Sequence, residues 1–349
     1  MIKEINIIIL YAEITNYLLG SLYHLIDKNS SIKLHIVYNN VFSNINILNK
    51  QRCNFFDKSN FKNKDELLRF CNNLNPSILL VSGRMFSDYL YVSKKMKSKT
   101  IRVTVQDTMF QPSLKQFMIK ALSTFMYFQY FDKFWGIGVS QTRFAKYIGF
   151  DDKDILHGFY VADKKFFSRS KIFSYENFNL NILFIGRLVK EKNILKLIEI
   201  VEKINTESGS SHKITIIGAG YLVDKVKESD IVNYHGVRTQ EEIINIALEC
   251  DVFCLPSIYE PWGVVTHEMS ALGMPVISSE LCGSSYDLVI DGYNGYKFNP
   301  HDDLSIKKAL ENFISLSNIR KKEYSANSIK ISKKINHDIW NQSILSLIN

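Results

Sequence analysis

The 349-residue chain has little of several features that mark special classes of protein. It contains only 6 prolines and no low-complexity segment, which excludes collagen-like and proline-rich disordered chains. Its 5 cysteines cannot all pair and show no framework spacing, so a small disulfide scaffold is excluded and a reduced, cytosolic compartment is expected. No apolar run approaches the roughly 18 residues of a membrane-spanning helix. The remaining composition, 46% hydrophobic and 22% charged, indicates a globular protein of about two domains.

Positive charge is concentrated in the first half of the chain. The formal net charge is +8, but residues 1–150 carry 20 Lys and Arg against 9 Asp and Glu, a balance of +11. Residues 151–349 carry 23 and 26, a balance of −3. This asymmetry indicates that one half faces nucleic acid, phospholipid or an acidic substrate. The alternative is a genome that simply favours Lys, Asn and Ile.

Two segments bear on membrane contact. The N-terminus, MIKEINIIIL, has an acidic residue at position 4 and no cleavage site, which predicts a first strand and not a signal peptide. Residues 117–130 are rich in aromatic side chains and have Lys115, Lys120 and Lys133 around them. A buried helix is the favoured interpretation. The alternative is a helix lying in a membrane surface, where basic and aromatic residues occur together.

Both halves alternate short apolar runs with helix-length amphipathic stretches. Strands are predicted at residues 6–10, 32–38, 78–82, 100–105 and 134–139, and then at 181–185, 213–217, 231–235, 252–255, 275–278 and 295–298. Helices are predicted between them at 193–205, 241–250, 263–272 and 304–316. Near-continuous apolar strands separated by helices indicate an α/β fold of two doubly wound, Rossmann-like parallel sheets. The predicted domains are 1–160 and 180–330, with a linker at 161–179 and a C-terminal helix, 331–349, that packs back toward the first domain.

The most informative stretch is residues 255–278, LPSIYEPWGVVTHEMSALGMPVIS. A buried strand ends at Leu255, Glu260 lies in the following loop, and Gly263 opens a helix. Glu260 therefore lies at the helix N-terminus and Glu268 on its second turn. Two carboxylates beside free backbone N–H groups, such as that of Val264, form a site that can hold sugar hydroxyls and a phosphate together.

These residues closely resemble the E-x7-E segment of the retaining family 4 glycosyltransferases of the GT-B fold. The sequence GRLVKEKN, from Gly186, resembles the family's turn that grips the donor diphosphate, with Arg187 and Lys192 in the gripping positions. The segments IIGAG and NYHGVRTQEEI resemble its nucleotide-base pocket, and SSELCGSSYDLVIDGYNGYKF resembles its next phosphate loop. The resemblance covers residues 134–335 well and the first 130 in outline. It implies two domains facing across a cleft, with the acceptor bound by the first and the donor by the second.

The resemblance also implies roles for individual residues. Glu268 should bind the ribose hydroxyls, Glu260 should contact the donor sugar, and the backbone around Val237 should contact the base. The remaining donor-binding candidates are backbone and side-chain groups of Gly186, Gly263, Val264, Gly283 and Ser284. Since such enzymes use front-face attack, in which the leaving phosphate takes the acceptor proton, no protein nucleophile is assigned. Arg187 and Lys192 then carry the largest catalytic share, because charge grows on the departing diphosphate.

No metal or further cofactor is expected beside the nucleotide-sugar substrate. Cys250 and Cys254 have no second Cys or His pair at zinc spacing, and they flank a predicted buried strand. The fold implied by the resemblance has no D-x-D metal site. Asp302 and Asp303 follow a proline and predict a helix N-cap and first turn.

The acceptor side departs from the family pattern. Many relatives carry a Gly-Gly loop after the first strand, where this chain reads YAEITNYLLG. Glu13, Thr15 and Asn16 lie there and are candidates for acceptor hydroxyls, or Thr15 caps a helix. Asp107 follows the fourth strand, where relatives place a His or Asp near the reacting carbon; it is a candidate catalytic residue, with a helix cap as the alternative.

Three further side chains have weaker cases. Arg84 follows a strand end and would bind an anionic acceptor group or be an ordinary surface arginine. His157 occupies the family's loop before the linker and is a candidate for a diphosphate contact. His267 precedes Glu268 and is expected to pack in the core.

The sequence therefore predicts a retaining hexosyltransferase. Its donor would be a UDP- or GDP-linked hexose, and its acceptor a cell-surface polysaccharide (capsule, lipopolysaccharide or O-antigen) or a lipid-linked oligosaccharide. A cytoplasmic location is expected, with the basic first domain in peripheral contact with the anionic inner face of the cell membrane. The alternative is a non-catalytic sugar-nucleotide or glycan-binding subunit of an assembly complex. Nucleic-acid binding is a distant option, because no recognisable module accompanies the basic charge.

Overall fold

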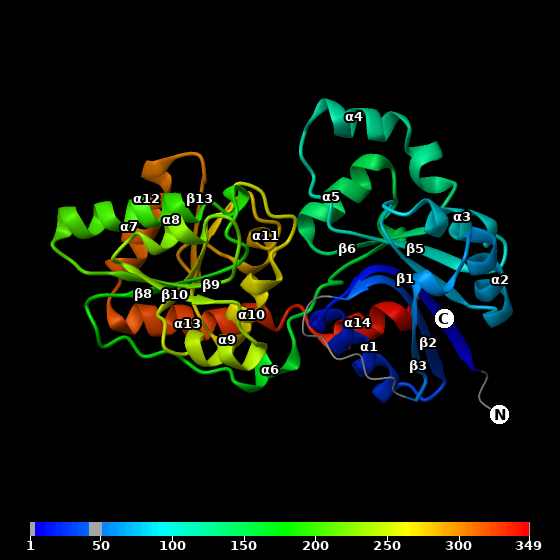
Figure 1. Ribbon diagram of the computed structural model, residues 1–349, viewed down its shortest axis with the longest axis horizontal. Helices are drawn as coiled ribbons and strands as arrows, with labels where there is room; N and C mark the ends of the chain where they lie inside the picture. The colour runs from blue at the N-terminus through cyan, green and yellow to red at the C-terminus, as the bar shows by residue number, and fades with distance from the viewer. Residues whose placement is uncertain (1–3, 42–50, 349) are drawn as a thin grey trace. The chain divides into compact units, whose positions relative to one another are not determined.

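A computed structural model describes residues 4–41 and 51–348 of the chain (Figure 1). The chain divides into two compact units. Unit 1 runs to Val161 and takes in the C-terminal segment from Ile335, whereas unit 2 is Ala162–Lys334. Each unit is an α/β structure built on one parallel sheet, which confirms the predicted fold class.

Unit 1 has a seven-stranded sheet of order β3-β2-β1-β4-β5-β6-β7. The strands are β1 (Ile5–Ile14), β2 (Ile32–Val41), β3 (Cys53–Asp57), β4 (Ile78–Ser82), β5 (Ile101–Gln106), β6 (Lys133–Gly136) and β7 (Ile155–Leu156). The helices are α1 (Asn16–Lys28), α2 (Lys64–Leu74), α3 (Ser87–Lys95), α4 (Leu114–Ala121), α5 (Val139–Ile148) and α14 (His337–Leu345). The short helical turns are η1 (Lys58–Asn60), η2 (Thr124–Phe128) and η3 (Asp152–Asp154).

The first strand is longer than predicted. The sequence indicates a strand over 6–10 and a loop after it, but β1 pairs with β2 along its length as far as Ile14 opposite Val41. Glu13 is therefore a strand residue, opposite Asn40, and α1 begins at Asn16 with almost no loop between. Cross-strand hydrogen bonds, which depend on a distant segment, extend the strand past the end of its apolar run.

Unit 2 has a six-stranded sheet of order β10-β9-β8-β11-β12-β13. The strands are β8 (Asn181–Ile185), β9 (Lys213–Ile217), β10 (Val232–Gly236), β11 (Val252–Leu255), β12 (Val276–Ser279) and β13 (Gly295–Phe298). The helices are α6 (Lys164–Ser168), α7 (Ile194–Ser208), α8 (Val223–Lys227), α9 (Gln240–Ala247), α10 (Val264–Leu272), α11 (Ser285–Leu288), α12 (Asp303–Ile314) and α13 (Asn318–Ser332), with a helical turn η4 (Lys190–Lys192). Asp302 caps α12 and accepts a hydrogen bond from the Leu304 backbone N–H, which confirms the predicted N-cap.

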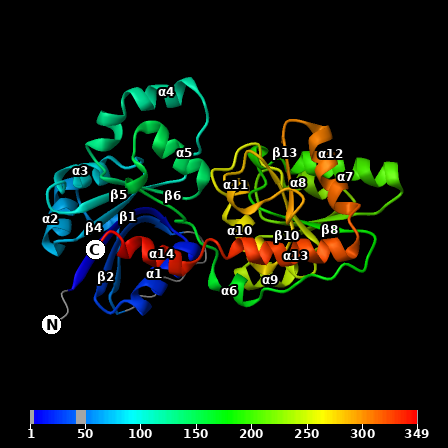
Figure 2. The same cartoon turned by 180° about the vertical axis from the view of Figure 1, so that it is seen from behind.

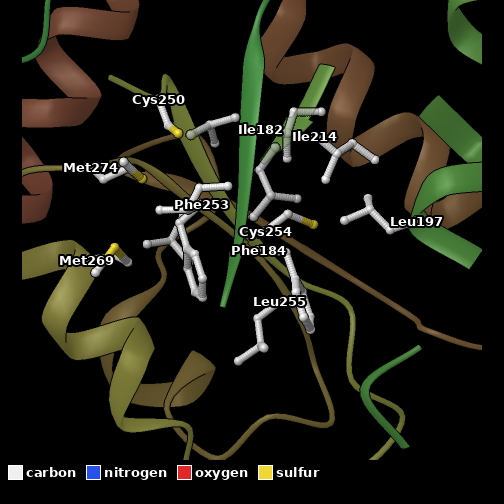
Figure 3. Close-up of a cluster of buried hydrophobic side chains, with 14 of the residues drawn as sticks. Ile182, Phe184, Leu197, Ile214, Cys250, Phe253, Cys254, Leu255, Met269 and Met274 are labelled. Atoms are coloured by element: carbon white, nitrogen blue, oxygen red, sulfur yellow. The ribbon is translucent and has the colours of Figure 1, made fainter. Parts of the chain in front are cut away.

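The core of unit 2 lies between its sheet and the helices on both faces. Figure 3 shows side chains of β8, β9 and β11 meeting those of α7 and α10. Cys250 and Cys254 pack there as small apolar groups, as the sequence predicts, and all five cysteines are buried. Burial raises the pKa of the Cys250 thiol to about 12, which keeps it protonated and inert.

The predicted linker at 161–179 is mostly part of unit 2. It carries α6, and its aromatic side chains Phe166, Phe173 and Tyr175 are buried in the unit 2 core. The Phe173 backbone N–H donates to Ser325 Oγ at 2.9 Å. The segment shows no periodicity in sequence because most of it is irregular, and its buried rings join the core of unit 2.

The end of the chain returns to unit 1. Helix α14 lies beside α1 in both views (Figures 1 and 2), and His24 Nε2 lies 2.7 Å from Asp338 Oδ1. Asn29 Nδ2 donates to Asn341 Oδ1 at 2.7 Å. Trp340 is fully buried against Trp135, with ring centroids 5.0 Å apart. Unit 1 therefore needs both ends of the chain to complete its core.

The expectation of one buried helix over residues 117–130 is wrong. The segment contains the end of α4 and the π-helical turn η2, and much of its apolar surface faces solvent. Phe117 is 61% exposed and Phe125 70%, whereas Tyr127 is buried. None of the helices in the described ranges is long and apolar enough to cross a bilayer.

Candidate active site

Five loops of unit 2 meet at one edge of its sheet. They follow β8, β9, β10, β11 and β12, which are neighbouring parallel strands, so all begin at the same carboxyl edge. The donor-binding candidates lie on these loops and on the start of α10: Gly186, Arg187, Lys192, Val237, Glu260, Gly263, Val264, Gly283 and Ser284. The structure thus brings together residues that are up to about a hundred positions apart in sequence.

The loops after β8 and β9 touch at two glycines. The Gly186 backbone N–H donates to Ile217 O at 3.0 Å. A Cβ on Gly218 would lie 1.9 Å from Gly186 O, and the Gly218 φ of +141° is itself unfavourable for other residues. One on Gly220 would lie 2.3 Å from Leu188 O. The glycines of IIGAG are therefore required for close loop packing, which holds the backbone that leads to Arg187.

Lys192 and Glu260 form a largely enclosed ion pair. Lys192 Nζ donates to Glu260 Oε2, and each side chain is only 14% exposed. Burial lowers the pKa of Lys192, and the positive charge of Arg187 nearby acts in the same direction. Arg187 is exposed and, within the described ranges, makes no ion pair. Two cations and one carboxylate at this edge leave a surplus positive charge for an anionic ligand.

The N-terminus of α10 opens beside this pair. Gly263 has φ +82°, and a Cβ there would meet Glu260 Cγ at 3.1 Å. The backbone N–H of Val264, in the first turn, has no carbonyl partner four residues earlier within the helix. The Ser284 backbone N–H donates to Trp262 O at 2.9 Å, which fixes the next loop against the helix start.

Three buried polar atoms beside the helix start lack a partner in the part of the chain that the structure describes. They are Ser284 Oγ, Trp262 Nε1 and Thr266 Oγ1. A buried donor without a hydrogen bond costs about 1–3 kcal/mol, and a ligand removes that cost. Ser284 was among the residues predicted from the sequence. Trp262 was not predicted, because a tryptophan after a proline is expected to pack in the core, and no sequence pattern indicates that its indole N–H lacks a partner.

Glu268 lies on the second turn of α10, partly exposed. Burial, and then the negative charge of Asp163, raise the pKa of its carboxyl from 4.5 to about 8. The neighbouring His267 is fully buried; its Nδ1 accepts from the Ala162 N–H at 3.1 Å, and its Nε2 lies 2.9 Å from Ser332 O. His267 therefore packs within unit 2, as predicted.

The predicted base-binding backbone lies on the loop after β10. Val237 is 60% exposed and follows Gly236, whose φ is +69°. The Gly218 N–H donates to Gly236 O at 2.8 Å, and the Tyr234 hydroxyl donates to Gly218 O at 3.0 Å. These bonds tie the Val237 loop to the glycine loop after β9. A groove of about 590 Å³ runs along β10 and α9, and its lining includes Asn181, Tyr234 and Glu249.

Unit 1 has its own pocket, of about 470 Å³, at the carboxyl ends of β1, β4 and β5. Glu13, Thr15, Arg84 and Asp107, which the sequence singled out, all line it. Asp107 opens onto the pocket. The surrounding protein removes water from its carboxyl and so raises its pKa. It does not cap a helix, because Ser113 caps α4. Thr15 occupies the N-cap position of α1 but makes no side-chain cap bond.

Arg84 is held inside this pocket and is not an ordinary surface arginine. Its guanidinium lies over the Tyr127 ring, 5.1 Å from the centroid. Its Nε is buried and has no hydrogen-bond partner in the described residues. The Tyr127 hydroxyl donates to Gln106 Oε1 at 3.2 Å, which fixes the ring beneath the guanidinium.

Three tyrosines that the sequence analysis did not select complete the pocket: Tyr11, Tyr17 and Tyr160. The rings of Tyr17 and Tyr160 are 4.7 Å apart, and burial raises the pKa of each of the three hydroxyls. They come from β1, α1 and the end of unit 1, so only the fold brings them together. His157 is not among the residues that line the pocket; its Nδ1 lies 2.9 Å from Thr142 Oγ1.

Comparison with known proteins supports the interpretation of unit 2. Residues 165–331 match the family model described as "Glycosyl transferases group 1". Unit 2 belongs to this glycosyltransferase family. The capsular polysaccharide biosynthesis glycosyltransferase CapM of Staphylococcus aureus is 27% identical over 179 residues, which are 50% of this chain and 47% of CapM. The GalNAc-alpha-(1->4)-GalNAc-alpha-(1->3)-diNAcBac-PP-undecaprenol alpha-1,4-N-acetyl-D-galactosaminyltransferase of Campylobacter jejuni is 28% identical over 153 residues, which are 42% of this chain and 42% of that protein.

The chain thus spans about half the length of the curated relatives it matches. Solved structures cover nearly all of it: Anabaena Alr3699/HepE, crystallised with UDP and glucose, matches 98% of this chain and 99% of its own with a TM-score of 0.73 and 14% identity. At this identity the likeness shows the fold, which is that of the group 1 glycosyltransferases, GT-B.

Proposed function

We propose that the chain is a retaining, metal-independent glycosyltransferase that moves a hexose from a nucleotide diphosphate sugar to a bacterial cell-surface glycan or its lipid-linked precursor. The observation that carries the proposal is the arrangement of Arg187, Lys192 and Glu260 at the start of α10, in a unit that belongs to the glycosyltransferase family. Surplus cations beside free helix N–H groups are suited to a diphosphate, and a carboxylate beside them is suited to a sugar hydroxyl.

In this proposal unit 2 binds the donor. Arg187 and Lys192 neutralise the charge that grows on the diphosphate as it leaves, and the backbone of Gly263, Val264 and Gly283 supports it. Glu268 accepts hydrogen bonds from the ribose. The Lys192–Glu260 pair holds both side chains in place before substrate arrives, which lowers the cost of ordering them in the transition state.

Unit 1 is proposed to bind the acceptor in the pocket that Asp107 and Arg84 line. The tyrosine rings offer flat apolar faces for a sugar ring, and the Asp107 carboxyl is placed to accept a hydrogen bond from an acceptor hydroxyl. No protein nucleophile is needed for front-face attack, because the leaving phosphate takes the acceptor proton.

The relatives guide the choice of substrates. CapM is named for capsular polysaccharide, the Campylobacter jejuni enzyme for an undecaprenol-PP-linked acceptor, and the Anabaena protein was crystallised with UDP. A UDP-linked hexose and a lipid-linked or polymeric glycan are therefore the first substrates to test. The basic balance of +11 over residues 1–150 favours an anionic acceptor or peripheral contact of unit 1 with an anionic membrane.

The experiment is a donor panel followed by product analysis. Thermal stabilisation by UDP-, GDP- and ADP-hexoses identifies the donor, since a ligand at 100 times its Kd adds roughly 2.7 kcal/mol. Transfer is then measured with lipid-linked acceptors in EDTA, and the anomeric configuration of the product is read by NMR. Arg187→Ala serves as the inactive control. Failure of every sugar nucleotide to bind, or a product of inverted configuration, contradicts the proposal.

A further inference from the structure

The longest run of exposed apolar side chains in the described residues lies on α4 and η2. Leu114, Phe117, Met118, Leu122 and Phe125, which we call the α4 surface, are 78%, 61%, 56%, 47% and 70% exposed. They stand at positions i, i+3, i+4, i+8 and i+11, a spacing that places them on one side of the helical segment. In Figure 1 α4 lies outermost in unit 1, beyond α5. A continuous apolar surface of this kind marks an interaction site more often than it marks a free surface.

The opposite side of the same segment is anchored in unit 1. The Gln116 side chain is buried and donates to Met109 O at 2.7 Å. Tyr127 is 3% exposed and packs against Phe144. The α4 surface is therefore held outward by well-packed residues beneath it.

The charged residues of the segment that carries the α4 surface are all positive. Between Asp107 and Asp132 the sequence contains no acidic residue, but it contains Lys115 and Lys120. The Lys120 ammonium lies over the Tyr147 ring, 4.7 Å from its centroid. Lys94 Nζ donates to Gln129 Oε1 at 2.8 Å, which adds a third cation beside η2. A partner that covers these residues must offer apolar contact and negative charge together.

We propose that the α4 surface inserts into the interfacial region of an anionic phospholipid bilayer. Leu, Met and Phe side chains would enter the acyl boundary, while Lys115, Lys120 and Lys94 contact lipid phosphates. Helix α4 has 8 residues and is about 12 Å long, so it lies in the interface and does not span the bilayer. This names the surface and the lipid charge that a peripheral attachment would use.

The inserted segment is connected to the pocket of unit 1. Tyr127 lines that pocket and supports Arg84, and Phe125 is exposed two residues earlier in the same turn. Insertion would hold the pocket beside the lipid headgroups, where a lipid-linked acceptor is presented. This last step rests on the proposed function; membrane binding itself does not.

The test is sedimentation of the full chain with vesicles. Vesicles of phosphatidylcholine with 30% phosphatidylglycerol are compared with pure phosphatidylcholine at 50 mM and 500 mM salt. We expect binding to the anionic vesicles at low salt and at least tenfold weaker partitioning of Phe117→Ser/Phe125→Ser. Lys115→Gln/Lys120→Gln should weaken partitioning by roughly tenfold or more, at about 1 kcal/mol for each basic residue. Phe178→Ser, which removes a 75% exposed phenylalanine from unit 2, is the matched control and should bind as the wild type does.

A second readout keeps the α4 surface apolar and adds a fluorescent side chain to it. All three native tryptophans are buried, so Phe125→Trp adds one exposed indole at the α4 surface. Its emission should shift to the blue on addition of anionic vesicles and be quenched by brominated lipids. No binding of the wild type, equal binding of the double variants, or no spectral change overturns the proposal. So does a dimer in solution that Phe117→Ser/Phe125→Ser converts to monomer.

The outcomes also separate this proposal from the proposed function. Sugar-nucleotide stabilisation of unit 2 should be the same in wild type and in Phe117→Ser/Phe125→Ser. If Phe117→Ser/Phe125→Ser loses vesicle binding but still binds the donor, the membrane surface is supported. If the wild type binds vesicles but binds no donor, the membrane surface is still supported and the glycosyltransferase proposal is contradicted.

Discussion

The carboxyl of Glu268 should make the stability of the protein depend on pH in a measurable direction. Its pKa is raised from 4.5 to about 8 by burial and by Asp163. The native state therefore keeps a proton that the unfolded chain releases as the pH rises above 4.5. Because the unfolded state then binds fewer protons than the native state, the free energy of unfolding falls with rising pH until the native carboxyl also ionises near pH 8.

The magnitude follows from the two pKa values. Between pH 5 and 8 this one group lowers the free energy of unfolding by up to about 1.4 kcal/mol for each pH unit. The interval from 4.5 to about 8 sets an upper limit of about 5 kcal/mol. Since water reaches part of the side chain, we expect a total of about 2 to 4 kcal/mol.

The substitution Glu268→Gln isolates this effect, because glutamine copies the neutral, protonated side chain. The variant and the wild type should be about equally stable at pH 5, and the variant should become the more stable by about 2 to 4 kcal/mol at pH 9. Urea unfolding at each pH, followed by tryptophan fluorescence and circular dichroism, gives the difference curve, in which other titrating groups cancel. Glu176→Gln removes an exposed carboxyl from the same unit and is the control. A difference curve for Glu268→Gln that stays flat or slopes the other way refutes the reasoning.

Three other predictions concern loop packing, charge and the C-terminal helix. Gly218→Ala should destabilise unit 2 by at least about 2 kcal/mol and abolish sugar-nucleotide binding, because its Cβ would lie 1.9 Å from Gly186 O. The control is Gly209→Ala, where φ is +67° and a Cβ would meet nothing within 4 Å; it should cost about 1 kcal/mol and leave binding intact. Calorimetry measures both the stability and the binding. Arg187→Ala should lower kcat about 100-fold or more without changing the Tm, since the side chain is exposed and unpaired within the described ranges; an unchanged kcat would contradict its role. Trp340→Ala should cost unit 1 about 3–5 kcal/mol in urea unfolding, because it empties the space against Trp135; a loss below 1 kcal/mol would show that α14 is dispensable.

Local features of the chain were predictable because short-range periodicity decides them. The strands β4, β8, β9 and β11 match their apolar runs within a residue, since a parallel strand covered on both faces must be apolar throughout. Glu260 and Glu268 lie eight residues apart across the start of one helix, so their relation to α10 follows from the helix itself.

Other features depended on contacts between distant segments. The edge strand β3 (CNFFD) mixes polar and apolar side chains and β7 has only two residues, so neither stands out in the sequence, and the neighbours they pair with make them strands. The same holds for the segment at 161–179, whose rings are buried only because unit 2 surrounds them. The helix over 117–130 was expected to be buried because its apolar residues are many, but periodicity cannot tell a core face from an exposed face.

The sequence by itself determined the α/β class, the two parallel sheets and the loops that carry the donor-site residues, because strand burial and helix starts are encoded locally. Tertiary structure alone decided which of those residues meet. It pairs Lys192 with Glu260, places Arg84 over Tyr127, raises the pKa of Glu268, brings α14 back to α1 and turns the apolar side of α4 outward. The physical reason is that charge pairing, desolvation and exposure depend on which atoms surround a side chain, and long-range packing sets those surroundings.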